Sequence, residues 1–128
     1  MNYKIFYQEL GKLLYAIAFS DKKITASEKE SLRKLVKEQV LPLEASKDKY
    51  GTDLGFLTEF EFDLLEERKA DPGSTFDDFI GYMKENKTGI PAALKNLAYD
   101  LASKVAESYR GINQNEKELL NKLKQVIA

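Results

Sequence analysis

The chain has 128 residues, 43% hydrophobic and 32% charged, a composition typical of one globular domain with its own hydrophobic core. It contains no histidine and no cysteine, which excludes Ser-His-Asp and Cys-His catalysis and nearly all zinc sites, so any bound metal would be an oxygen-preferring ion such as calcium or magnesium. The net charge is −1, and residues 53–85, with ten acidic and three basic side chains, lie between mildly basic flanks, a distribution that argues against a nucleic-acid surface.

The N-terminal part predicts a helical hairpin over residues 1–41. In the first helix, apolar residues recur at steps of three and four, the period of an amphipathic helix. They are Tyr3, Phe6, Tyr7, Leu10, Leu13, Leu14 and Ile17. The segment SDKKIT breaks this pattern, and a second predicted helix carries Leu32, Leu35, Val36 and Val40 before it ends near Pro42.

An acidic insert over residues 53–87 predicts two more helices. Phe56, Phe60 and Leu64 recur at helical spacing. The stretch EFEFD also alternates like a strand, but an isolated short strand would have no partner, so helix is favoured. The turn DPGS is expected to end this helix, and Thr75 with Asp78 resembles the N-terminal cap of the next.

One side of the first insert helix is expected to be acidic, with its carboxylates at Glu59, Asp63, Glu66 and Glu67. Like charges at this spacing repel one another by a few tenths of a kcal/mol, so a cation or a basic partner would stabilise them. A solvated face offset by the basic flanks of the chain is the alternative.

A second hairpin is predicted over residues 91–127, after a loop KTGIP that places Pro91 in a first helical turn. Its sequence repeats the first hairpin: residues 104–123 placed on 16–35 give nine identities in twenty positions, which indicates an internal duplication. The identical pairs include Ala18 with Ala106 and Leu35 with Leu123.

Both hairpins turn on a similar cap. Thr25 with Glu28, and Asn113 with Glu116, have the spacing of a capping box. In this motif the Thr or Asn side chain accepts a hydrogen bond from the backbone amide of the Glu, and the Glu side chain accepts one from the backbone amide of the Thr or Asn. Ile24 and Ile112 precede these caps, and we expect them to be wedged between the helices of their own hairpins.

The segments LLYAIAFSDKKITASEKESLRKL and LASKVAESYRGINQNEKELLNKL resemble the two repeats of the tellurite-resistance TerB-like family. The resemblance implies a compact helical module linked to metal and stress responses, with acidic residues near the helix turns that bind divalent cations. The matching positions here are Asp21, Glu28 and Glu116. Tyr109 stands where the second repeat would carry an aspartate, so any calcium or magnesium site is expected to be single, weak and in the first repeat.

These patterns predict an all-α domain: a six- to seven-helix bundle of two pseudo-twofold-related hairpins around the acidic insert. The favoured function is a non-enzymatic, TerB-like binding or scaffold module with a protein partner. A weak divalent-cation sensor is the alternative, and a carboxylate-dependent hydrolase is a remote one. No apolar run approaches the roughly 18 residues of a membrane span and no signal-peptide core is present, so we expect a cytoplasmic protein.

Overall fold

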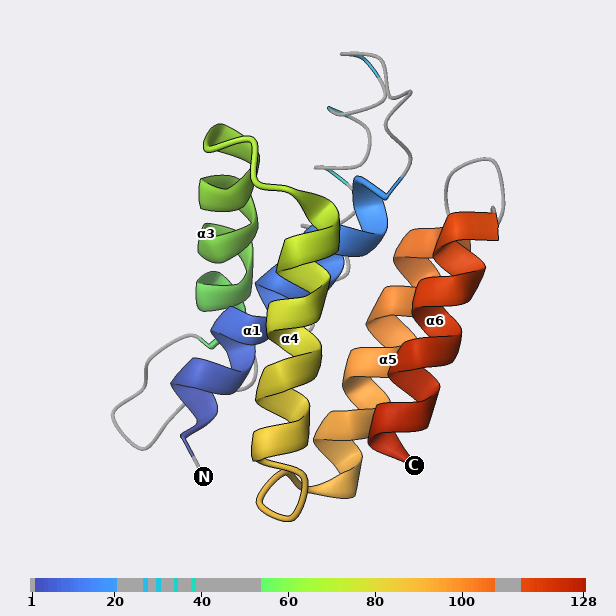
Figure 1. Cartoon of the computed structure of the whole chain (residues 1–128). Coiled ribbons are helices and arrows are strands. Elements are labelled where there is room, and N and C mark those ends of the chain that lie inside the picture. The colour runs from blue at the N-terminus through green and yellow to red at the C-terminus, as the bar shows by residue number, and fades with distance from the viewer. Residues whose placement is uncertain are drawn as a thin grey trace.

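The computed structural model describes residues 2–20, 54–107 and 114–128, together with the isolated helical positions 27, 30, 34 and 38. Every regular element in these ranges is an α-helix, which confirms the predicted all-α class. The five helices of Figure 1 are α1 (Tyr3–Ala18), α3 (Leu54–Glu67), α4 (Pro72–Glu85), α5 (Ala92–Glu107) and α6 (Gln114–Ile127). The described ranges thus hold five helices where six or seven were predicted for the whole chain. The helix predicted before Pro42 lies outside them except at those four isolated positions.

Helix α1 is the centre of the bundle, because it packs against α3, α4 and α5. In Figure 1, α3 lies to the left, α4 crosses in front of α1, and the antiparallel pair α5 and α6 lies to the right. Helix α6 packs against both α4 and α5. The second half of α1, from Leu13 to Ala18, is buried on every side, as expected for a helix surrounded by other helices.

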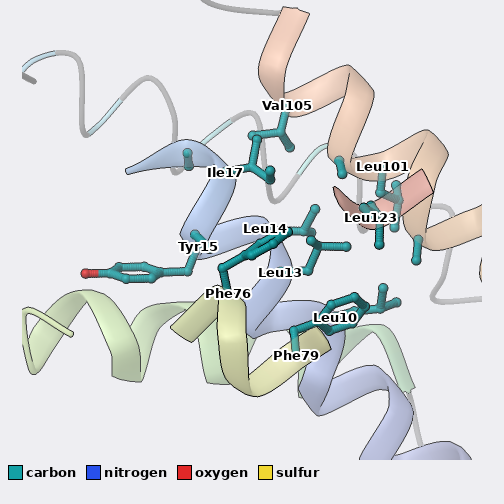
Figure 2. Packing of buried hydrophobic residues seen from close by; sticks show 14 of the residues in the cluster. Leu10, Leu13, Leu14, Tyr15, Ile17, Phe76, Phe79, Leu101, Val105 and Leu123 are labelled. Atoms are coloured by element: carbon teal, nitrogen blue, oxygen red, sulfur yellow. The ribbon is translucent and has the colours of Figure 1, made fainter. Parts of the chain in front are cut away.

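The hydrophobic core joins residues of all five helices into one cluster. Figure 2 shows Leu10, Leu13 and Leu14 of α1 directed toward Phe76 and Phe79 of α4 and toward Leu101 and Leu123 of α5 and α6. Six of the seven apolar residues predicted for the first helix are buried. Tyr3 is 47% exposed because it lies in the first turn, at the end of the bundle.

Helix α3 confirms the predicted helix, but the residues that indicated it do not form its buried side. Thr58, Phe62 and Leu65 face the core, whereas Phe56 and Phe60 face solvent. The sequence of α3 is apolar almost all the way round, so its periodicity does not identify the side that packs against α1.

The link between α3 and α4 differs from the prediction. Helix α3 ends at Glu67, and the amides of Lys69 and Ala70 bond the carbonyls of Glu66 and Leu65, the pattern of a Schellman cap. The DPGS segment begins α4 instead of ending α3: Asp71 is the N-cap, with its carboxylate accepting from the Ser74 amide at 2.8 Å. The predicted cap at Thr75 was therefore wrong. Asp71 accepts a hydrogen bond from one of the unpaired amides at the start of α4, and the proline after it has no amide hydrogen to satisfy, so a cap at Asp71 is more favourable than one at Thr75.

Lys69 has a φ of 52°, the left-handed conformation that this cap requires and that glycine adopts without strain. We expect Lys69→Gly to raise the free energy of unfolding by about 1 kcal/mol. Denaturant melts would check this, with Lys104→Gly at an exposed position of α5 as the control, expected to lower it by about 1 kcal/mol. A lower stability of Lys69→Gly would contradict the capping assignment.

The predicted second cap, Asn113, comes directly before Gln114, the first described residue of α6, so the described ranges do not test it. Asn113 itself, like Ile112, Ile24, Thr25 and the rest of the predicted first cap, lies outside the described residues. None of the helices in the described ranges is long and apolar enough to cross a membrane.

Candidate protein-binding surface on helix α3

The four carboxylates predicted as an acidic surface all lie on α3. Glu67 is exposed, and Glu59, Asp63 and Glu66 are half-buried. Helical spacing places Asp63 and Glu67 on the same side of α3 as Phe56 and Phe60, with Glu59 and Glu66 at its edge. We call this side the α3 surface; it consists of Phe56, Glu59, Phe60, Asp63, Glu66 and Glu67.

The aromatic pair at the centre of this surface was not expected there. Phe56 is 57% exposed and Phe60 is 51% exposed, and their rings stack with centroids 5.9 Å apart and planes at 24°. Full burial of one phenylalanine side chain stabilises a protein by about 1.5–3 kcal/mol. These two rings leave much of that gain unrealised within the fold, and a partner surface that covered them would recover it.

The opposite side of α3 is anchored to α1 at close range. The Thr58 hydroxyl donates to the Tyr7 carbonyl at 2.6 Å, and both residues are buried. Gly11 makes this approach feasible, because a Cβ there would lie 2.7 Å from the Thr58 carbonyl oxygen. The backbone of α1 therefore fixes the position of α3, and with it the direction in which Phe56 and Phe60 face.

A second anchor holds the C-terminal end of α3. The Tyr15 hydroxyl donates to the Ala70 carbonyl at 2.6 Å, and the Tyr15 ring contacts Phe19 and Phe62. Burial raises the pKa of Tyr15, and the charges of Glu66 and Asp71 raise it further, so this hydroxyl stays a donor at neutral pH. The α3 surface is thus presented by a rigid element.

Asp63 has an unusual position within this surface. Its Oδ1 atom is buried and accepts no hydrogen bond in the part of the chain that the structure describes. A desolvated carboxylate oxygen of this kind is stabilised by any positive charge brought close to it.

Glu9 of α1 is a second unusual carboxylate, and sequence reasoning missed it. Its Oε1 accepts from the Lys12 ammonium at 3.1 Å, while Oε2 is buried with no donor among the described residues. Burial raises the pKa of Glu9, as do the nearby charges of Asp78 and Glu61, and Lys12 only partly offsets them. A raised carboxyl pKa is common in active sites, but Glu9 does not line either groove described below.

The raised pKa of Glu9 predicts a pH dependence of stability. Because the folded state holds the proton more tightly than the unfolded state, the stabilisation is complete below pH 4.5, the ordinary pKa, and is lost as the pH rises through the folded pKa. Relative to wild type, Glu9→Gln should therefore become progressively more stable as the pH rises through this window.

Denaturant melts across the acidic and neutral range measure this difference. Lys12→Met serves as the companion variant, because loss of the ammonium should raise the pKa of Glu9 further and steepen the pH dependence. If the stability of Glu9→Gln relative to wild type stays constant or falls as the pH rises, the pKa of Glu9 is not raised in the folded protein.

Of the predicted cation ligands, only Glu116 lies within the described residues. It is buried at 7% exposure in the first turn of α6, where helix amides favour a negative charge. Asp21 and Glu28 lie outside those ranges. No group of three or more acidic side chains suited to a metal ion is found in the described part of the chain, so the single weak calcium or magnesium site remains a prediction.

Two grooves lie on other faces of the bundle. The first, of about 520 Å³, runs between α4 and α6, and we call it the α4/α6 groove. It is lined by Phe76, Asp77, Ile80, Lys84, Lys87, Lys122, Gln125 and Val126. The second, of about 260 Å³, lies where the N-terminal ends of α4 and α6 meet Ser20, and Asp71 and Glu118 both line it.

No protein-family model, curated protein or solved structure matches this chain at a significant level. The function is therefore inferred from the chain's own surfaces. Of these, sequence reasoning identified the acidic residues of α3 but missed the exposure of Phe56 and Phe60. The sequence carried no clear signal of it, because the stretch EFEFD contains both the exposed Phe60 and the buried Phe62.

Proposed function

We propose that this protein is a non-enzymatic binding or scaffold module that holds a protein partner on its α3 surface. The observation that carries the proposal is the stacked pair Phe56 and Phe60, each more than half exposed on a helix whose other side is anchored in the core. Exposed aromatic clusters rimmed by polar groups are typical of protein interfaces, and aromatic residues supply much of the binding energy there.

The charge around the pair defines the partner's chemistry. Helix α3 carries five carboxylates and no basic residue. Complementary potentials speed encounter and select the correct partner. The expected partner therefore presents an apolar strip or groove flanked by lysine or arginine side chains, and we expect the complex to weaken as salt screens these charges.

Capture from cells that make the protein tests this proposal. The bait is the full chain, compared with Phe56→Ala and Phe60→Ala variants, and Tyr3→Ala is the matched control because Tyr3 is an exposed aromatic residue outside the α3 surface. We expect the two phenylalanine variants to lose the partner and the Tyr3 variant to keep it. Equal recovery by all four proteins would contradict binding through α3.

We also propose that the chain is a TerB-like module of six or seven helices, with two related hairpins around the insert. Nine identities between residues 16–35 and 104–123 support the duplication. The identical pairs that are described in both copies behave alike: Ala18 and Ala106 are buried, and Lys34 and Lys122 are helical and exposed. The link to metal or stress responses follows from the resemblance alone, and a role as a scaffold in such a response is consistent with the α3 surface.

A further inference from the structure

The α4/α6 groove has the chemistry that the α3 surface requires of a partner. Its apolar floor is formed by Phe76, Ile80 and Val126. Its charged lining consists of three lysines, Lys84, Lys87 and Lys122, against the single carboxylate of Asp77. An apolar trough with an excess of positive charge accepts an amphipathic helix that presents aromatic and acidic side chains on one side.

The α3 surface is a helix side of that kind. It offers two phenylalanines one turn apart, with carboxylates at Asp63 and Glu67 on the same side. We infer that the α4/α6 groove of a second copy of this chain receives the α3 surface, so that copies associate head to tail. This inference rests on the proposed function, since it names the partner that covers Phe56 and Phe60.

The arrangement of the helices determines the kind of assembly. Helices α3 and α6 lie on either side of α4 in Figure 1, so the α3 surface of one copy does not cover its own groove. The two contacting surfaces are different, which makes the interface heterologous. A head-to-tail dimer therefore keeps one unused α3 surface and one unused groove. Further copies add to these as the concentration rises, which gives either a closed ring or a growing chain.

The experiment is sedimentation or light scattering of the full-length chain as a function of concentration, with variants that block one surface each. Phe56→Ser with Phe60→Ser blocks the α3 surface, and Lys87→Glu with Lys122→Glu blocks the groove. The average mass of wild type should increase with concentration. Each double variant alone should associate at least about tenfold more weakly than wild type. The control, Lys104→Glu with Lys117→Glu, makes the same charge change at exposed positions outside the groove. It should associate more strongly than the groove variant.

Mixing the two blocked proteins gives the decisive result. One component retains an intact groove and the other an intact α3 surface, so a heterologous interface predicts discrete one-to-one dimers that grow no further. A mixture that stays monomeric while wild type associates would overturn the inference, as would a wild type that remains monomeric at millimolar concentration. If, in that second case, capture of another protein still depends on Phe56 and Phe60, the proposed function stands with a different partner.

Discussion

Replacement of Phe62 by alanine is expected to lower the free energy of unfolding by about 3–5 kcal/mol. Phe62 is 1% exposed, and its ring lies 5.9 Å from Tyr15 and 6.0 Å from Phe19, measured between centroids. The alanine would leave a cavity between α3 and α1 and remove an edge contact to a ring whose hydroxyl ties α1 to Ala70. Both the transfer energy and the aromatic contacts are lost.

The matched control is Phe60→Ala, two residues earlier on the same helix. Because Phe60 is about half exposed, its removal should change stability by less than about 1 kcal/mol. Denaturant melts of both variants separate the two sides of α3 directly. Similar losses for Phe60 and Phe62 would mean that Phe60 is a core residue, and the α3 surface would then have no place in binding.

Gly11→Ala is the second variant with a large expected effect, a loss of about 1–3 kcal/mol. The added Cβ would lie 2.7 Å from the Thr58 carbonyl oxygen and 2.8 Å from the Glu61 Cβ. The first of these is backbone, so α3 itself would have to shift away from α1. That shift would also stretch the hydrogen bond from the Thr58 hydroxyl to Tyr7. Alanine's better helix propensity, about 1 kcal/mol, offsets only part of the cost.

Gly81→Ala on α4 provides the opposite result as a control. Nothing lies within 4 Å of the Cβ position at Gly81, so the substitution should raise stability by about 0.5–1 kcal/mol through helix propensity alone. Thermal melts of the two glycine variants should therefore shift in opposite directions. A stabilising Gly11→Ala would show that α1 and α3 do not approach as closely as Thr58 requires.

These two experiments also bear on function, because they test the anchoring of α3. A helix held by Gly11, Thr58 and Phe62 on one side presents Phe56 and Phe60 in a fixed direction on the other. Preorganised aromatic side chains bind with less loss of conformational entropy than mobile ones. Destabilisation of the anchor should therefore weaken partner binding even where the α3 surface itself is unchanged.

The helical class and much of the helix layout follow from the amino-acid sequence without tertiary information. The stripes from Phe6 to Ile17 and from Ala98 to Val105 have one wide apolar side each, and both lie in the core as helices. This succeeds because helical periodicity is a local property, expressed within a few turns of the chain. The absence of histidine and cysteine likewise restricts the side-chain chemistry of the protein whatever fold it adopts.

The buried side of α3, and with it the exposure of Phe56 and Phe60, depends on tertiary contacts. Apolar residues occur around most of this helix, so the choice depends on which side can approach α1, and that depends on a glycine 47 positions earlier, Gly11 opposite Thr58. The same is true of Glu9, whose neighbours come from three helices, and of the α4/α6 groove. Contacts between residues distant in the chain have no period, and a single sequence therefore does not reveal them.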